Sequence, residues 1–393
     1  MPKGRPIRLL CAFALLAGAL RPAGAAPEPA TPGFEGFDYA FRFASAIVSD
    51  PKDRGAAQES VVTELIQAGL LDEAVRRARQ IDDWRRGTTL ADAATAYAQA
   101  GQVATAQGLL KEAEEFRGRV TGWQNPRIEA HAAAAHASLG ETEAATRISS
   151  ELAANDKQYA GRGVATIAAG RARAGDFDGA MGTLAKIDKE TDFDITWWRT
   201  VGYLNIAKRT ELTKTQRRKA LDAARTSAAG VDGWKRAEAL ESIAEEYRLA
   251  GDTRVARQCL EEAAALVHAQ PDSMSAKSSL LSNLARAWGR LGDKRRAEEA
   301  IAKAEGMIPG LTVTERAPAW AGLAASAAAA GDTVRARGLW DKALDATEAL
   351  ENARPRALSA TAVCRSIGRA GQPLDAAHRA RLDALLTNLK APW

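Results

Sequence analysis

Residues 320–343 read WAGLAASAAAAGDTVRARGLWDKA, and this stretch decides the fold. Small and apolar residues recur in it at three- and four-residue spacing on both sides of Gly331, which is typical of two amphipathic helices. Glycine takes a positive φ at no steric cost, so Gly331 ends the first helix. Asp332 then caps the start of the second helix. Ala336 falls where the two helices approach closely, and the stretch therefore predicts an antiparallel helical hairpin.

The pairing of a glycine with an alanine five residues later recurs along the chain. Eight copies have both residues, with glycines at Gly69, Gly101, Gly140, Gly175, Gly251, Gly292, Gly331 and Gly371 and alanines at Ala74, Ala106, Ala145, Ala180, Ala256, Ala297, Ala336 and Ala376. A ninth copy keeps Ala220 but has Thr215 in the glycine position. Successive copies lie 32 to 41 residues apart, a period typical of helical repeats that stack on their neighbours. The sequence therefore predicts an all-α array of about nine antiparallel helical hairpins.

The repeat resembles that of the tetratricopeptide family. The match is carried by Trp320, Leu323 and Ala324 before the turn and by Ala336, Trp340 and Ala343 after it. The resemblance implies a right-handed α-solenoid whose first helices line a concave groove. The repeats here average about 38 residues, against 34 in the family. Alanine also replaces the family's first-helix glycine, at Ala244 and Ala285 among other positions. These departures leave other helical-hairpin solenoids as an alternative.

The N-terminal segment has the pattern of a secretory signal peptide, residues 1–25. Lys3, Arg5 and Arg8 precede an apolar run at residues 9–20, which is too short to span a bilayer. Small residues follow, so we expect cleavage after Ala25 and export of a bacterial protein to the periplasm or the medium. A short membrane anchor is the alternative. Residues 26–33 are a proline-rich linker.

Aromatic residues cluster in the segment of residues 34–52, just before the first repeat. The first unit of an array exposes an apolar face, so we predict that this segment caps it. Residues 53–393 are predicted to form the repeat domain, which ends in an amphipathic helix near residues 374–389. Trp84, Trp123 and Trp234 each lie seventeen residues before a turn glycine, and this recurring position predicts packing between repeats.

The charge balance argues against a nucleic-acid partner. The chain has 54 Lys and Arg against 49 Asp and Glu, but four of the basic residues lie in the predicted signal. The mature chain is then nearly neutral, and it has no long basic run interleaved with aromatic residues. Cys259 and Cys364 lie about three repeats apart, beyond the reach of a disulfide bond, and are predicted to be buried apolar residues.

The sequence offers no motif for catalysis. It has no glycine-rich phosphate loop, no glycine-flanked nucleophilic serine, no His-Glu-x-x-His and no calcium loop. His131 and His136 are five residues apart on a predicted helix, so they point in different directions and do not predict a metal site. We therefore expect a protein that is not an enzyme and that binds no cofactor or metal.

The groove implied by the resemblance is the candidate binding site. Carried over position by position, its walls present mostly alanine in repeats two to four and eight, and polar or charged residues in repeats five to seven. The polar and charged residues are Asn205, Arg209, Glu241, Glu245, Arg248, Arg286 and Arg290. Such a groove fits a peptide or protein segment held by central polar contacts, and so predicts a scaffold or adaptor outside the cytoplasm. A solvated helix face with intrahelical ion pairs is the alternative.

Two other function classes stay open at this point. A carbohydrate-active enzyme would need acidic residues and tryptophans in one cleft, and Trp197, Trp198, Glu241 and Glu245 are the candidates. A structural envelope component would have no selective groove and would associate through its ends.

Overall fold

The computed structural model describes residues 33–156, 159–209, 211–271 and 275–389. These residues contain nineteen α-helices and no strand, which confirms the prediction of an all-α fold. The predicted signal peptide and nearly all of the linker lie outside the described residues. Within the described ranges, no helix is both long enough and apolar enough to cross a membrane.

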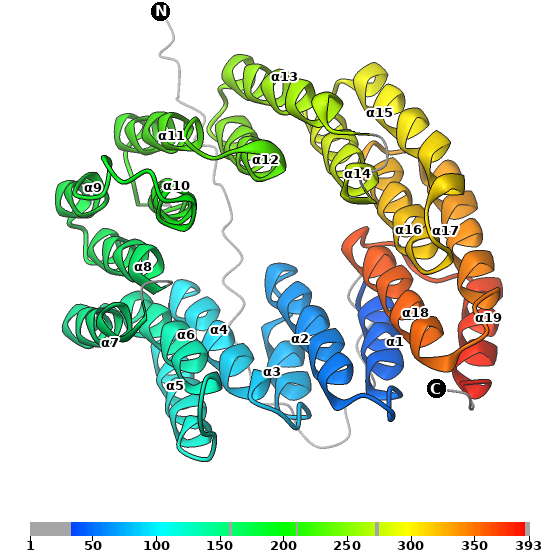
Figure 1. Cartoon of the computed structure of the whole chain (residues 1–393), viewed down its shortest axis with the longest axis horizontal. Helices are drawn as coiled ribbons and strands as arrows, with labels where there is room; N and C mark the ends of the chain where they lie inside the picture. Colours follow the sequence, from blue (N-terminus) through cyan, green and yellow to red (C-terminus); the bar gives the residue numbers. More distant parts are fainter. Residues whose placement is uncertain (1–32, 157–158, 210, 272–274, 390–393) are drawn as a thin grey trace, which may run out of the picture. The chain divides into compact units, whose positions relative to one another are not determined.

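Within the described part of the chain, nine helices form an inner row in which each helix packs on the next (Figure 1). They are α2 (Pro51–Gln67), α4 (Arg85–Gln99), α6 (Gln124–Ser138), α8 (Ala160–Arg173), α10 (Phe193–Ala207), α12 (Gly233–Leu249), α14 (Ser275–Arg290), α16 (Val313–Ala329) and α18 (Ala353–Arg369). An outer helix returns the chain after each inner helix, so the inner helices all run in the same direction.

Eight outer helices each pack on the inner helix that precedes them. They are α3 (Leu71–Ala78), α5 (Val103–Arg117), α7 (Thr142–Asn155), α9 (Phe177–Ala185), α11 (Lys214–Ala228), α13 (Thr253–Ala269), α15 (Lys294–Met307) and α17 (Thr333–Glu348). A short 3-10 helix, η2 (Ile308–Gly310), follows α15. Two further helices, α1 (Phe34–Ser45) and α19 (Ala376–Thr387), stand at the ends of the array.

The turns of the hairpins follow the predicted chemistry. All eight turn glycines have a positive φ, between 63° and 85°. The predicted aspartate caps are also present: Asp252, Asp293 and Asp332 each accept a hydrogen bond from the backbone N–H three residues later. The copy without a glycine is built differently, because α11 begins at Lys214 and so contains Thr215. Thr213 caps that helix in a capping box with Gln216.

The alanines five residues after the turns lie at the seams of the hairpins. Eight of the nine have no exposed surface: Ala74, Ala106, Ala145, Ala180, Ala220, Ala256, Ala297 and Ala336. This confirms that the two helices of a hairpin meet at a small residue. Ala376 is the exception, since it is exposed at the start of α19. In the last repeat, therefore, the helix that follows the turn does not pack as the others do.

Helix α1 occupies the place beside α18 that an outer helix holds in every other repeat. It runs antiparallel to α18, because Gly36 lies at Gly368 and Ala40 lies at Thr361, whose hydroxyl donates to the Ala40 carbonyl over 3.5 Å. Helix α1 also packs on α2, as outer helices pack on the next inner helix. The ninth hairpin is thus made of α18 and α1, from opposite ends of the chain, and the inner row closes on itself.

Glycines allow α1 and α18 to come this close. A Cβ on Gly36 would lie 2.6 Å from the backbone nitrogen of Gly368, and a Cβ on Gly368 would lie 2.7 Å from the Phe37 ring. Four of the aromatic residues of the predicted capping segment are buried, namely Phe37, Tyr39, Phe41 and Phe43. The segment therefore covers helices from both ends of the repeat array.

Polar contacts join the two ends as well. The Tyr39 hydroxyl donates to Asp383 of α19 over 2.8 Å. Arg365 of α18 donates through Nε to Glu64 of α2 over 2.9 Å. Arg354 at the start of α18 is paired with Asp50 over 3.0 Å. These contacts connect residues about 300 positions apart in the sequence, so closure is a tertiary feature that no local pattern encodes.

Candidate binding site

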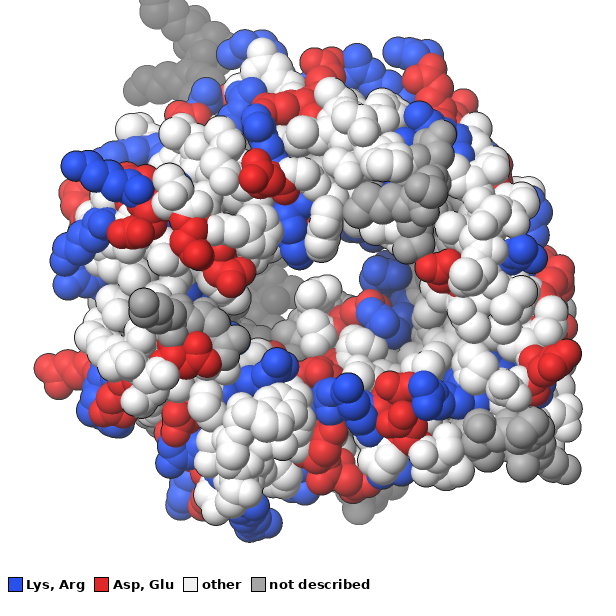
Figure 2. All heavy atoms as spheres, in the orientation of Figure 1, with Lys and Arg blue, Asp and Glu red and all other residues white. Residues whose placement is uncertain are grey.

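The inner helices enclose an opening in the described array, and Lys, Arg, Asp and Glu side chains border it (Figure 2). The predicted groove residues all come from inner helices or from the end of one, which places them on this side of the array. The opening is therefore the candidate binding region, and its wall has distinct parts.

A cavity of about 520 Å³ lies on the wall formed by α4, α6, α8 and α10. We call it the basic cavity. Its polar lining residues are Thr95, Gln99, Ser138, Arg162, Thr166, Arg173, Trp198, Asn205, Lys208, Arg209 and Glu211, and alanines fill the rest. Two predicted site residues, Asn205 and Arg209, are thus brought together with cations that the sequence analysis did not select.

The cations of the basic cavity exceed its carboxylates. Arg209 is 3.7 Å from the Glu211 carboxylate, and Arg173 donates to the Ala98 carbonyl over 2.7 Å. Within the described residues Arg162 forms no ion pair, and burial lowers the pKa of its guanidinium despite the attraction of Asp92. A desolvated cation without a partner is costly, so this wall favours an anionic group on a ligand.

The other five predicted residues lie on α12 and α14. Arg248 donates to Glu245 through Nε over 2.7 Å, and Arg290 reaches the same carboxylate over 3.4 Å. Arg286 donates to Asn283 over 2.8 Å. The Glu245–Arg248 pair confirms the predicted intrahelical ion pair, and the Arg248 hydrogen bond is the main reason that the pKa of Glu245 is lowered. Most charge in this group is therefore satisfied within the protein.

Glu241 is the exception in this second group. Its Oε1 atom is buried and accepts no hydrogen bond within the described part of the chain. Burial raises the pKa of Glu241 to about 8, even though Arg286 favours the charged form. The carboxyl group is therefore largely protonated at neutral pH.

A second cavity, of about 300 Å³, adjoins the basic cavity and shares Arg162 and Trp198 with it. We call it the aromatic cavity. Its lining residues are Glu59, Trp84, Arg127, His131, Tyr159, Arg162, Asp194 and Trp198, contributed by five inner helices or the residues just before them. The sequence analysis missed this site, because these residues lie up to 139 positions apart.

Both acidic and basic side chains line the aromatic cavity. Glu59 accepts a hydrogen bond from Thr88 over 3.1 Å and pairs with Arg85 over 3.2 Å, yet burial still raises its pKa. His131 is held through Nδ1 by Asp92 over 2.5 Å. Burial also raises the pKa of Tyr159, which stays a neutral phenol.

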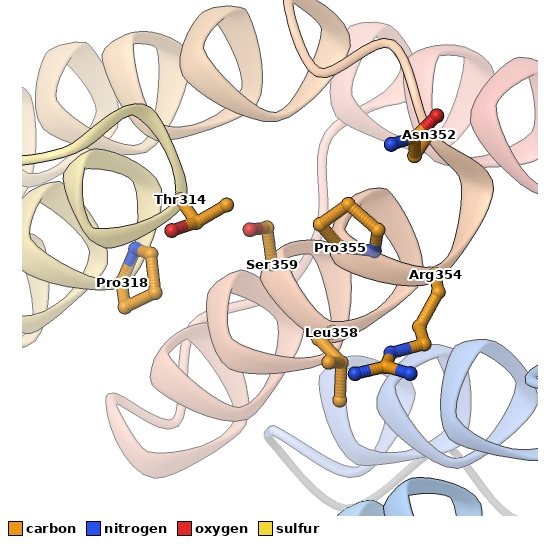
Figure 3. Close-up of a pocket in the computed structure, with 7 residues that line it drawn as sticks. All are labelled: Thr314, Pro318, Asn352, Arg354, Pro355, Leu358 and Ser359. Carbon is orange, nitrogen blue, oxygen red and sulfur yellow. The ribbon is translucent and has the colours of Figure 1, made fainter. Parts of the chain in front are cut away.

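A third cavity, of about 500 Å³, lies between the N-terminal ends of α16 and α18 (Figure 3). Thr314 and Pro318 face Ser359 and Pro355 across it. Its one charged lining residue, Arg354, is already paired with Asp50 and Asp53 at 3.0 Å. Among the described residues that line this cavity, none has an unpaired charge, so it is a weaker candidate than the two on the other wall.

The tryptophan positions correct one prediction. Trp84 contacts Trp123 across two repeats, with ring centroids 5.6 Å apart, as packing between repeats requires. However, Trp123 is 60% exposed and Trp234 is 39% exposed, so neither is a packed core residue. Both stand at the start of an inner helix. The predicted grouping of Trp197, Trp198 and Glu241 is not assembled in either cavity of the α4–α10 wall.

In the part of the chain that the structure describes, no group of three or more His, Cys, Asp or Glu residues could hold a metal ion. His136 is paired with Glu141 over 2.5 Å and with Glu114 over 3.1 Å. Cys259 and Cys364 are buried free thiols, which confirms their predicted role, and burial raises the pKa of Cys259 to about 11.

No family model matches the chain, and no curated protein matches it in sequence. Among solved structures, the human IFIT1 dimer with m7Gppp-AAAA is 14% identical, covers 79% of this chain and 72% of that chain, and has a TM-score of 0.27. A monomeric IFIT1 mutant with Gppp-AAAA is 14% identical over 79% and 73% of the two chains, with a TM-score of 0.28. A circular tandem repeat protein with novel repeat topology is 13% identical over 80% and 70%, with a TM-score of 0.17. Likenesses this distant carry no argument about a ligand. The hairpins and their glycine turns show a tetratricopeptide-like helical repeat protein.

Proposed function

We propose that this chain is a non-catalytic scaffold that acts outside the cytoplasm and binds a peptide or protein segment against the wall of its central opening. Asn205 and Arg209, two residues of the predicted groove, both line the basic cavity, and this observation supports the proposal most directly. The signal-like N-terminus supports export.

The lining of the basic cavity suits a polypeptide backbone. Side-chain amides and hydroxyls of Gln99, Asn205 and Ser138 offer donors and acceptors to peptide groups. Ala134, Ala165 and Ala169 leave room for the backbone to approach. Lys208 supplies a charge for an acidic side chain of the segment.

Site-specific crosslinking tests this function. A photoreactive amino acid replaces Asn205, which lies at the surface and lines the basic cavity. The labelled chain is then mixed with the extracytoplasmic fraction of the source bacterium and irradiated. The control carries it at Val334, which is 82% exposed on outer helix α17. We expect a discrete crosslinked protein from position 205 alone, lost when Arg209→Ala is added. Equal or absent crosslinking at both positions would contradict the proposal.

Export has its own test. N-terminal sequencing of the chain purified from that fraction should begin at Ala26 if the signal is cleaved after Ala25. An intact N-terminus in the cytoplasmic fraction would contradict this part of the proposal.

A further inference from the structure

Aromatic side chains mark the start of five successive inner helices. Trp84, Trp123 and Tyr159 immediately precede α4, α6 and α8, Phe193 is the first residue of α10, and Trp234 is the second of α12. We call these five residues the aromatic rim. Because the inner helices run in the same direction, the rim follows one edge of the opening.

Three of the five residues of the aromatic rim are open to solvent, whereas Tyr159 is buried, with 8% of its surface exposed. Trp123 is 60% exposed, Phe193 45% and Trp234 39%. Each of these three rings stands at the start of a different inner helix. A surface of this kind offers a series of individual stacking faces, which suits a chain ligand with a repeating unit.

Cations accompany the aromatic rings. The Arg127 guanidinium lies 5.3 Å from the Trp84 ring centroid and 5.0 Å from that of Trp123. The Lys235 ammonium lies 4.4 Å from the Trp234 centroid. In the described residues, neither Arg127 nor Arg162 forms an ion pair, although Asp92 attracts Arg162 and the Trp198 ring centroid lies 5.4 Å from its guanidinium.

The aromatic cavity opens onto this rim, since Trp84 and Tyr159 belong to both. Its walls are the Trp84, Tyr159 and Trp198 side chains. Glu59, Asp194 and Arg162 place charged groups between those walls. A purely apolar ligand would remove water from these charged groups and offer no hydrogen bonds in return, which is costly. A ligand that fits must have flat apolar faces and many hydroxyl groups.

Sugar rings meet this description. Their C–H faces stack on aromatic rings, and their hydroxyls donate to carboxylates such as Glu59 and Asp194. The unpaired Arg162 adds a demand for a carboxylate on the ligand, which its guanidinium can hold through two hydrogen bonds. A DNA strand fits less well, because its sugars have no free hydroxyls to donate to Glu59 and Asp194.

We infer that the aromatic cavity and the aromatic rim bind an acidic polysaccharide, with one carboxylate-bearing sugar in the cavity against Arg162 and later units stacked along the rim. This site goes beyond the proposed function. It concerns another ligand, and Asn205 does not line the aromatic cavity, so the crosslinking test and the saccharide test fail independently.

Calorimetric titration of the full chain with tetragalacturonate tests the cavity. We expect the unchanged chain to bind tetragalacturonate saturably. The dissociation constant should rise at least about tenfold in Arg162→Gln and in Trp198→Ala. The control is Arg295→Gln, which removes an exposed guanidinium of outer helix α15 and should bind as the unchanged chain does. Binding that is absent, or that both cavity variants leave intact, would overturn the inference.

Matched ligands separate the possible partners. The methyl ester of tetragalacturonate has the same rings without the charges and should bind about tenfold more weakly. An oligothymidylate and a hexaglutamate peptide should bind more weakly than tetragalacturonate. Equal binding of the ester, or tighter binding of the oligonucleotide or the peptide, would overturn the inference.

The rim has a separate readout. Trp123→Ala should weaken the binding of octagalacturonate severalfold and leave the binding of tetragalacturonate unchanged, because only the longer oligosaccharide reaches beyond the cavity. An equal effect on both lengths, or on neither, would contradict binding along the rim. Circular dichroism and thermal melting of each variant confirm that it is folded.

Discussion

Tryptophan occupies two environments in this chain. Trp288 and Trp340 are 3% exposed and lie in the main hydrophobic core, whereas Trp123 projects from the start of α6 with 60% of its surface in water. Trp288 lies four residues before the turn glycine Gly292 and Trp340 nine residues after Gly331, whereas Trp123 lies seventeen residues before Gly140. The difference comes from position in the hairpin, since the N-terminal end of an inner helix has no further layer to cover it.

Replacing these tryptophans should give very different losses of stability. Trp340→Ala removes a buried ring whose Nε1 donates to Ser366 over 3.1 Å, and should lower the free energy of unfolding by about 3–5 kcal/mol. Trp123→Ala should lower it by less than about 1 kcal/mol. Urea denaturation followed by circular dichroism measures both. A loss for Trp123→Ala as large as that for Trp340→Ala would mean that the rim is part of the core.

Glu241 makes stability depend on pH. Its pKa is about 8 in the folded chain, above the ordinary carboxyl value of 4.5, so the unfolded chain loses this proton first as the pH rises. The contribution of the neutral carboxyl is thus present in acid and is lost between about pH 4.5 and pH 8.

Glu241→Gln should remove this dependence. The difference in free energy of unfolding between the variant and the unchanged chain should shift in favour of the variant by about 1–3 kcal/mol from about pH 5 to pH 9. This figure is smaller than the full pKa difference implies, because the side chain is partly exposed. Urea titrations at both pH values measure the gain. Glu143→Gln, at an exposed residue of α7, is the control. A gain of the same size in the control, or none in Glu241→Gln, would contradict the account.

At the scale of helices, the pairing of α1 with α18 depends on an exchange of large and small residues. In the other hairpins, an alanine of the outer helix faces the inner helix. In the ninth hairpin, Phe37 of α1 is buried against Gly368 of α18. The small residue has moved from one helix to the other, so the two surfaces still fit.

An added methyl group at this contact should therefore be harmful. Gly36→Ala should lower the free energy of unfolding by about 1–3 kcal/mol, because its Cβ would lie 2.6 Å from a backbone nitrogen of α18. Gly338→Ala is the matched control: Gly338 is in the middle of α17, and a Cβ there meets no atom within 4 Å. The control should raise stability by up to about 1 kcal/mol, through helix propensity. Thermal and urea denaturation of both variants test this pair, and a loss in both would contradict close packing of α1 on α18.

The local features of the hairpins could be predicted from the sequence. The turn at Gly331 and the seam at Ala336 follow from backbone conformation and side-chain size, which are properties of neighbouring residues. The helix after Gly371 was also predicted, and α19 is present at residues 376–387. The packing of α19 could not be predicted, because Ala376 has the same spacing from its turn glycine as the buried alanines. Ala376 is exposed because α1 already occupies the place beside α18 that the helix after the turn would take.

At the scale of the whole array, closure depends on the small rotation between successive repeats. This rotation accumulates over nine hairpins, and the sizes of many side chains together determine it. It therefore cannot be predicted from any short sequence motif. The aromatic cavity depends on it too, since Glu59 and Trp198 share a cavity only because the inner helices between them curve around the opening. Of the predicted site, the sequence identified Asn205 and Arg209 on the basic cavity but not the neighbouring Arg162. The handedness of the array and the bounds of its domains stay predictions.

The central claim is that α1 completes the ninth hairpin and closes the array. Spin labels at Arg42→Cys on α1 and Asp383→Cys on α19 test it by electron–electron distance measurement, since these two side chains are 3.8 Å apart. The native cysteines are buried and stay unlabelled. A closed array predicts a narrow distribution at roughly 20 Å or less, the distance of neighbouring helices plus the label arms. An open array of nine hairpins, each adding about 9 Å, would give a broad distribution at several tens of ångströms and would contradict the account.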